Sequence, residues 1–287
     1  MQLIRLTLPS GEFYFDTMSS NITSVHGYTC AQIYGNTFSY IKAYQMDRNK
    51  KHNLGDTLSL IIRDTGVTHK LHNENAPEMV GRKTPFLKHV RKKGTNLTSI
   101  EPNHPGENYS ENFVGKEKIG SGKIMVREQV PVQLWCYALQ YYCDLSNMIV
   151  TGMFINKGRT GYKIILGNNL DISEYVEFEF YEYCLYRDST QGFPHENKHL
   201  GRWIKFAHIV IQAMVYYVIR NNMKVIDIRT VSHLYHLDYD VYETMVRLKQ
   251  WDNTIKGRIG YHINAISEEN IQTPDMGKGN IISKHEL

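Results

Sequence analysis

The 287-residue sequence lacks the features of membrane and secreted proteins. It has no apolar run long enough to span a bilayer, and its first residues, MQLIRLTLPSGEF, are too broken for a secretory signal. A disulfide framework or zinc site is not indicated either, because the four cysteines show no CxxC spacing. We therefore expect a soluble, non-secreted protein of the nucleus or cytoplasm, with buried free thiols and no membrane partner.

Strong net charge is also missing, since the sequence carries only +4 with a pI near 8.7. Positive charge is nevertheless concentrated in residues 82–93, RKTPFLKHVRKK, which contain no acid. Such a block is typical of surfaces that contact phosphate backbones. The candidate nucleic-acid contacts here are Arg82, Lys83, Arg91, Lys92 and Lys93. A solvated helix face explains the same charges equally well.

The first half of the chain alternates between strand and helix patterns. Strands are predicted at 13–16 and 28–46, with a turn at 35–36, and again at 69–73 and 97–100. Between them, helical spacing and closing glycines predict helices over 49–65 and 83–93. A long amphipathic helix follows over 131–150. This alternation indicates an α/β layer structure.

The composition changes in the second half. Residues 156–177 resemble a turn-rich linker, and short aromatic strands follow from Phe178, with a tight turn at 221–222. We expect a core domain over 1–155, the linker, a small antiparallel β-barrel over 178–234 and a polar, partly disordered tail over 235–287. Trp203 and the tyrosine-rich strands are expected in the core of the barrel rather than as base-stacking surfaces.

Three acidic residues lie where predicted elements end or begin. Asp16 follows EFYF, Glu74 follows THKLHN, and Glu111 follows the proline-punctuated run IEPNHPGENYS. Carboxylates that converge from separate elements suit a site for Mg²⁺ or Mn²⁺, because hard cations prefer oxygen ligands. Taken singly, Asp16 also fits a turn cap, and each glutamate also fits an ordinary surface acid.

Several motifs together resemble the integrase region of a Ty1/copia-type retrotransposon polyprotein, over about residues 13–234. In the first half these are FYFDT, VHGYTCAQIY, HNENAPEM and EPNHPGENYSE. In the second half they are LWCYALQYYCDL, GRTGYKIILGN, DISEYVEFEFYEY, LGRW and KVIDIRTVSHL. The resemblance implies a ribonuclease-H-like α/β core, a mixed five-stranded sheet flanked by helices, followed by the small antiparallel β-barrel. It also implies a multimer that joins DNA ends to target DNA with two divalent metal ions.

The resemblance assigns the catalytic and metal-binding roles to Asp16, Glu74 and Glu111. Glu74 departs from the pattern, because the family has an aspartate at that place. The extra methylene moves the carboxylate by about 1.5 Å, whereas active-site geometry is usually held within roughly 0.5 Å. We therefore expect weak or absent strand transfer from this chain.

Further DNA contacts are predicted around Glu111. Asn108 lies one turn before it, and Lys116, Lys118 and Lys123 follow on the same predicted helix. Lysines of this kind give salt-sensitive, largely sequence-independent binding, although a solvated basic face is an equally good interpretation. In the predicted barrel, further phosphate contacts are expected from Arg187, Arg202, Lys205 and Arg220.

Two functional alternatives to an integrase fragment detached from its polyprotein remain open. One is a non-catalytic DNA-binding or assembly protein that keeps the fold, which the change at Glu74 favours. The other is an unrelated nuclease of the same fold, which needs a fourth ligand near Glu74, and His72 is the candidate.

Overall fold

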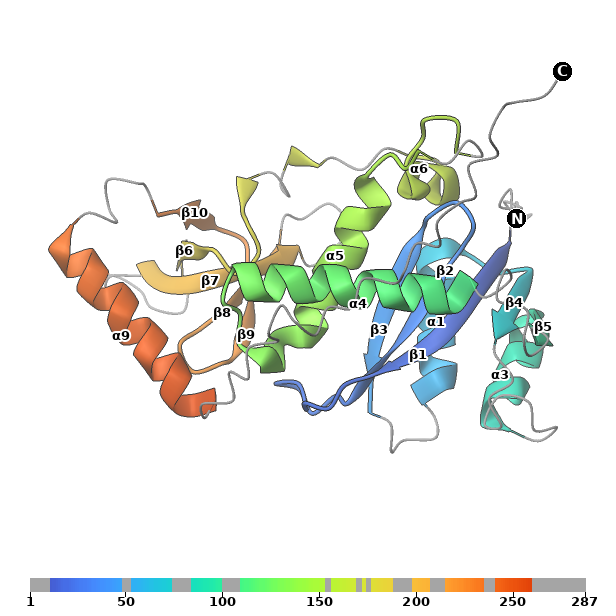
Figure 1. Cartoon of the computed structure of the whole chain (residues 1–287), viewed down its shortest axis with the longest axis horizontal. Helices are drawn as coiled ribbons and strands as arrows, with labels where there is room; N and C mark the ends of the chain where they lie inside the picture. The colour runs from blue at the N-terminus through green and yellow to red at the C-terminus, as the bar shows by residue number, and fades with distance from the viewer. Residues whose placement is uncertain are drawn as a thin grey trace, which may run out of the picture.

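The computed structural model describes residues 11–47, 53–73, 84–99, 109–152, 156–168, 172–173, 177–187, 198–206, 215–234 and 241–259. The strands are β1 (Glu12–Ser19), β2 (Cys30–Gly35), β3 (Ile41–Met46), β4 (Lys70–Asn73), β5 (Asn96–Ser99), β6 (Tyr183–Arg187), β7 (Lys198–Phe206), β8 (Tyr216–Ile219), β9 (Val225–Ile228) and β10 (Val231–His233). The helices are α1 (Asn53–Thr65), α3 (Pro85–Lys93), α4 (Tyr109–Arg127), the 3₁₀ turn η2 (Val132–Leu134), α5 (Trp135–Met148), α6 (Gly161–Leu166) and α9 (Tyr242–Ile259). Figure 1 shows two sheets with α5 between them.

The first sheet is mixed and has the strand order β3-β2-β1-β4-β5. Strand β2 is antiparallel to both β1 and β3, whereas β4 is parallel to both β1 and β5. Strand β1 is therefore central, and its side chains alternate between the two faces of the sheet. Phe13 and Phe15 are buried on one face, and Tyr14, Asp16 and Met18 belong to the other. The predicted mixed five-stranded sheet flanked by helices is confirmed.

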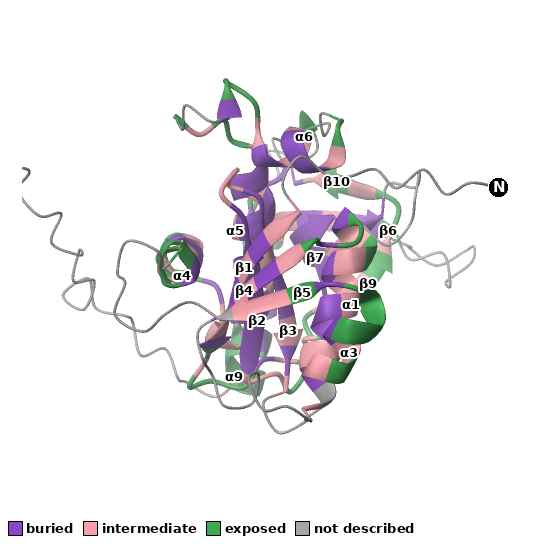
Figure 2. Ribbon diagram, turned by 90° about the vertical axis from the view of Figure 1, so that its right-hand side faces the viewer, coloured by how far each residue is buried: buried purple, intermediate pink, exposed green. Residues whose placement is uncertain are grey.

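Helices cover both faces of this sheet. Figure 2 shows α1 and α3 on one side and α4 on the other. On the α1 and α3 side, Phe13 and Phe15 pack with Phe86 of α3 in one hydrophobic cluster. Helix α3 is delimited by a cap at each end, since Thr84 accepts a hydrogen bond from Leu87 N and the chain leaves through a left-handed Gly94. These caps explain why the basic helix was predictable.

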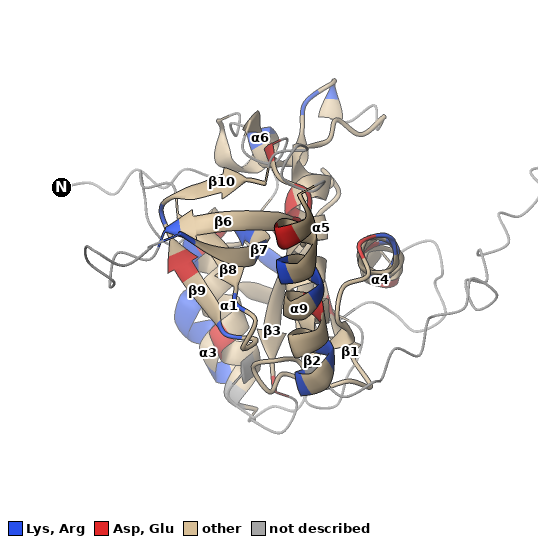
Figure 3. Ribbon diagram, turned by 90° about the vertical axis from the view of Figure 1, so that its left-hand side faces the viewer, with Lys and Arg blue, Asp and Glu red and all other residues tan. Residues whose placement is uncertain are grey.

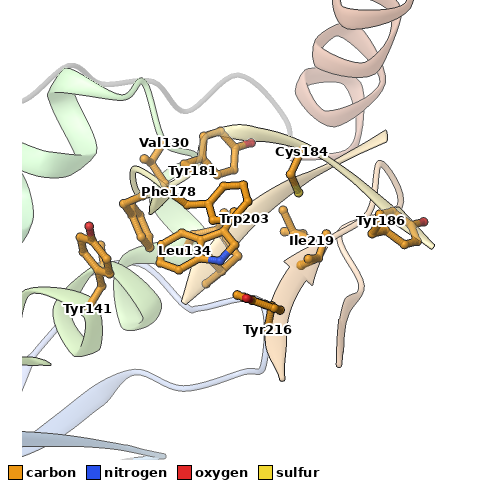
Figure 4. Packing of buried hydrophobic residues seen from close by; sticks show 14 of the residues in the cluster. Val130, Leu134, Tyr141, Phe178, Tyr181, Cys184, Tyr186, Trp203, Tyr216 and Ile219 are labelled. Carbon is orange, nitrogen blue, oxygen red and sulfur yellow. The ribbon is translucent and has the colours of Figure 1, made fainter. Parts of the chain in front are cut away.

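The second sheet is antiparallel throughout, with the order β10-β6-β7-β8-β9. Its core is built around Trp203, which is 0% exposed and stacks against Phe178. Figure 4 shows that Leu134 of η2 and Tyr141 of α5 reach into this same cluster. The predicted β module is thus present as a five-stranded sheet, and the expectation of a core Trp203 is confirmed.

Helix α5 contributes side chains to both sheets. Leu139 and Cys143 pack against the first sheet, in a cluster that includes Ile33 and Ala43. Ala138, on another side of the helix, joins the cluster of the second sheet. This arrangement follows from the apolar residues on two sides of one amphipathic helix.

Two helices occur in segments predicted as linker and tail. Helix α6 lies within 156–177, and α9 lies within 235–287. Helix α9 packs on the second sheet through Trp251 and Ile255, which are spaced one turn apart. The domain boundaries themselves remain predictions.

The expectation of buried free thiols is confirmed. Each of the four cysteines, Cys30, Cys136, Cys143 and Cys184, is buried and free. No helix within the described ranges has the length and apolar character needed to cross a bilayer.

Candidate functional site

Asp16 lies on the central strand of the first sheet. It is half-buried, pairs with Ile33 of β2, and accepts a hydrogen bond from the Thr17 backbone N–H at 2.6 Å. Strand alternation puts it on the same face as Tyr14, the face that α4 crosses. The carboxylate is thus attached to the strand at the centre of the first sheet.

The second predicted carboxylate, Glu74, lies outside the described residues. Strand β4 is described up to Asn73, which pairs with Phe15 of β1 and is buried. The described part of β4 therefore ends beside the residue that precedes Asp16.

Glu111 lies in the first turn of α4, as predicted from the proline-rich run before it. Two neighbours attach this end of the helix to the sheet face that carries Asp16. The Tyr109 ring lies 5.1 Å from the Tyr14 ring, and Phe113 packs so closely on Gly35 that a Cβ there would lie 2.4 Å from its Cδ2. Glu111 itself is exposed. The structure thus brings Asp16 and the Glu111 turn to one face of the sheet.

His72, the candidate fourth ligand of the nuclease alternative, already has other contacts. Its Nδ1 lies 2.9 Å from Thr98 Oγ1, its Nε2 lies 3.4 Å from a Glu12 carboxylate oxygen, and its ring stacks on Tyr14. Burial lowers the pKa of His72, and the Lys70 ammonium acts in the same direction. The ring is therefore neutral at neutral pH and is held by β1 and β5.

The donor chemistry of this face suits a hard divalent cation. Asp16 and Glu111 offer carboxylate oxygens, the ligands that Mg²⁺ and Mn²⁺ prefer. Within the described part of the chain, however, no three His, Cys, Asp or Glu side chains come together as a metal-holding group. A complete site of the predicted kind would need the carboxylate of Glu74.

The basic helix α3 does not lie beside Asp16 and Glu111. Its Arg91, Lys92 and Lys93 are exposed in the last turn, but Phe86 fixes α3 to the opposite face of the sheet from α4. In Figure 3, α3 and α4 lie apart, with Lys and Arg on both. Arg82 and Lys83 lie outside the described residues. The two basic surfaces are therefore separate.

The three lysines predicted on α4 are exposed. Lys116, Lys118 and Lys123 all lie away from the buried side of the helix, which is formed by Ser110, Glu117, Gly120 and Ser121. Asn108, the predicted contact one turn before Glu111, lies outside the described residues. The described lysines are accessible to a phosphate backbone.

Basic residues named in the second sheet have contacts within the chain, and the guanidinium carbon of Arg220 lies 5.4 Å from the centre of the Tyr186 ring. Arg202 donates to Asp252 Oδ1 at 2.9 Å, and its guanidinium carbon lies 3.5 Å from the centre of the Tyr183 ring. Lys205 is buried and donates to Asp144 Oδ2 at 3.0 Å. These contacts attach α9 and α5 to the sheet, so Arg202 and Lys205 are corrected from phosphate contacts to structural residues.

Sequence reasoning missed a buried ionic group between the two sheets. Asp144 of α5 accepts hydrogen bonds from Lys42 of β3 at 2.5 Å and from Lys205 of β7 at 3.0 Å. One carboxylate thus pairs with two lysines that are far apart in the sequence. Local sequence patterns carried no signal of it, because each partner comes from a different element.

Sequence reasoning also missed Glu117, a buried carboxyl group on α4. It is 0% exposed, and the Ser146 hydroxyl of α5 donates to its Oε1 at 3.3 Å. Burial raises the pKa of Glu117 to about 7. Next to it, Gly120 allows α4 to approach α5, because a Cβ there would lie 2.0 Å from Tyr142 Cζ.

No protein-family model and no curated protein matches the sequence. Among solved structures, the chain is similar to the catalytic core domain of BIV integrase, with 16% identity, 58% of this chain and 97% of that chain covered, and a TM-score of 0.41. It is also similar to the HTLV-2 integrase catalytic core domain in complex with magnesium (15% identity, 55% and 98% covered, TM-score 0.43). A simian T-cell lymphotropic virus intasome in complex with PP2A regulatory subunit B56 gamma gives 12% identity, 79% and 83% covered, and a TM-score of 0.40. Likenesses this low assign no function, so the functional argument rests on the residues of this chain.

Proposed function

We propose that this chain is an integrase-type DNA strand-transfer protein of Ty1/copia descent. In this proposal it binds element ends and target DNA as a multimer, with Mg²⁺ or Mn²⁺ held by Asp16, Glu74 and Glu111. The substitution of glutamate at position 74 slows its chemistry.

One observation carries the proposal. Asp16 lies on the central strand, and α4 crosses the same face of the sheet with Glu111 in its first turn. Two carboxylates from distant parts of the chain are thereby brought to one face, in the order that the family resemblance implies. The exposed Lys116, Lys118 and Lys123 on the same helix supply positive charge for a phosphate backbone.

Strand transfer is a phosphoryl displacement at a target phosphorus. The oxygen of a DNA 3′-hydroxyl forms a new bond to that phosphorus and loses its proton to solvent, and the bond to the target's own 3′ oxygen breaks. The departing oxygen then takes up a proton. Divalent cations, when bound, stabilise the charge on the attacking and departing oxygens. The chain contributes rigid positions: Asp16 by its place in β1, and Glu111 by the packing of Tyr109 and Phe113.

A second candidate function is a DNA-binding or assembly protein without catalysis. The glutamate at position 74 favours it, because a longer side chain displaces a metal ligand by more than active sites usually tolerate. The exposed lysines would serve this function equally well. The two candidates differ in turnover and agree on DNA binding.

The deciding experiment is a strand-transfer assay with a labelled DNA end and a supercoiled target, in Mg²⁺ or Mn²⁺. The native chain is compared with Glu74→Asp and Asp16→Asn. We expect weak transfer by the native chain, clearly faster transfer by Glu74→Asp, and none by Asp16→Asn. Thermal shift with the metal alone provides a parallel readout, in which stabilisation should disappear in Asp16→Asn.

The outcomes separate the candidates. DNA binding without transfer in both the native chain and Glu74→Asp would support the non-catalytic function. If Asp16→Asn keeps full transfer activity, the proposed site is wrong. Absence of DNA binding by the native chain would reject both functions.

A further inference from the structure

A tyrosine at the start of α4 has an unusual exposure. Among the described Phe, Tyr and Trp residues, Tyr109 and Tyr242 are the two in the exposed class, at 40% and 79%. Tyr242 begins α9, the helix that packs on the second sheet through Trp251 and Ile255. Tyr109 instead lies against the first sheet, two residues before Glu111. A large ring that leaves much of its surface in water gives up part of the stabilisation that burial would provide.

The inner side of the Tyr109 ring is supported by other rings. It lies 5.1 Å from the Tyr14 ring at 48°, and Tyr14 stacks on His72 at 4.5 Å and 13°. His72 is in turn held by Thr98, whose Oγ1 lies 2.9 Å from the His72 Nδ1. The three rings come from α4, β1 and β4 and form a supported aromatic surface, with Tyr109 as its exposed member.

Two observations place this aromatic surface next to the candidate site. Tyr14 precedes Asp16 by two residues on the same strand and face, a separation of roughly 7 Å. Tyr109 precedes Glu111 within the first helical turn. A nucleotide whose phosphate approaches these carboxylates would therefore carry its base to the level of the aromatic surface.

We propose that Tyr109, supported by Tyr14 and His72, stacks an unpaired nucleobase at the DNA end. This inference rests on the proposed function and adds a positioning residue to it. Every base has an aromatic face, so the contact would be largely indifferent to sequence. It would fix the terminal nucleotide, whereas the lysines of α4 hold the backbone.

The test uses the full chain and a short DNA duplex with a single-stranded overhang. The overhang carries the fluorescent base 2-aminopurine, whose emission is quenched when it stacks. Binding is measured by anisotropy at several salt concentrations in Mg²⁺. The variants are Tyr109→Phe, Tyr109→Leu and Tyr109→Ala, with Tyr242→Ala as the matched exposed-tyrosine control.

We expect the native chain, Tyr109→Phe and Tyr242→Ala to quench the overhang. Tyr109→Ala and Tyr109→Leu should lose the quenching and bind roughly 5- to 150-fold more weakly, the range that loss of one stacked base produces. The dependence of binding on salt should stay unchanged, because stacking releases no counterions. Tyr109→Leu retains apolar packing on Tyr14, so it separates loss of stacking from loss of helix docking.

The inference is overturned if the native chain binds the DNA but leaves the 2-aminopurine bright. It is also overturned if Tyr109→Leu quenches as the native chain does, or if Tyr242→Ala loses as much as Tyr109→Ala. These outcomes leave the proposed function intact, because DNA is still bound. Failure of the native chain to bind DNA at all would instead remove the proposed function and this inference together.

Discussion

Replacing Glu117 by glutamine should make the stability of the fold less dependent on pH. The Glu117 carboxyl lies between α4 and α5, where burial raises its pKa from the usual 4.5 to about 7. The Cys143 thiol, the Lys116 ammonium and the Ser146 hydroxyl all lower that pKa, but they do not outweigh burial. The folded protein therefore keeps a proton on this group that the unfolded chain loses.

The sign and size of the effect follow from that difference. Between about pH 4.5 and pH 7 the folded state binds more protons than the unfolded state, so the free energy of unfolding falls as pH rises. Above the folded pKa the loss is complete and the curve levels. At about 1.4 kcal/mol per pH unit, the two pKa values correspond to a total of roughly 3 kcal/mol. Glutamine has nearly the same shape and stays neutral, so Glu117→Gln should avoid this loss.

Urea denaturation, followed by tryptophan fluorescence at about pH 5 and about pH 8, measures the difference between the variant and the native chain. Glu117→Gln should gain up to roughly 3 kcal/mol relative to the native chain on going from the lower to the higher pH. Titration of all other groups cancels in this difference. Glu243→Gln, an exposed change on α9, should show a constant difference. A Glu117→Gln difference that is the same at both pH values would refute the reasoning.

Two further predictions concern the packing of α4 on α5 and the ion pairs of Asp144. Gly120→Ala should lower the free energy of unfolding by roughly 1–3 kcal/mol, because its Cβ would meet a ring of α5 at 2.0 Å. A Cβ at Gly115 on the same helix would meet open space, so Gly115→Ala should raise the free energy of unfolding by up to about 1 kcal/mol. Equal effects of the two substitutions in urea denaturation would contradict this reasoning. Asp144→Asn should cost roughly 3–5 kcal/mol, because it leaves Lys42 and Lys205 near each other without their carboxylate. Adding Lys205→Met should recover part of that loss. An Asp144→Asn variant with the native free energy of unfolding would show that the ion pairs contribute nothing.

Local sequence signals predicted the first sheet well because its turns and helix ends are set by residues that lie close together in the sequence. The turn after Gly35 is closed by the Asn36 side chain, which accepts backbone N–H bonds from Phe38 and Tyr40. The strand pattern at 13–16 placed Asp16 at a strand end, whereas β1 continues to Ser19, and the proline-rich run placed Glu111 at a helix start. Those features act over a few residues, so they can be read from the sequence.

Features that depend on distant partners were not predictable in the same way. A run of charges showed that α3 is basic but not which face of the sheet it covers, since Phe86 decides that by packing on Phe15. Glu117 lies between two lysines, so the sequence alone predicts an exposed side chain, and only the packing of α4 on α5 buries it. Helix α9 docks through Trp251 and Ile255 and through the Arg202–Asp252 contact, and the partners of these residues come from another part of the chain.

The position of α5 has a mechanical consequence. Because one helix fills the interiors of both sheets, they cannot swing against each other without opening two apolar interiors and separating the Lys42 and Lys205 side chains from Asp144. The second sheet is therefore held against the first sheet and does not move as an independent, flexibly linked unit. A molecule that contacts both sheets would meet them at the spacing that their shared packing on α5 sets.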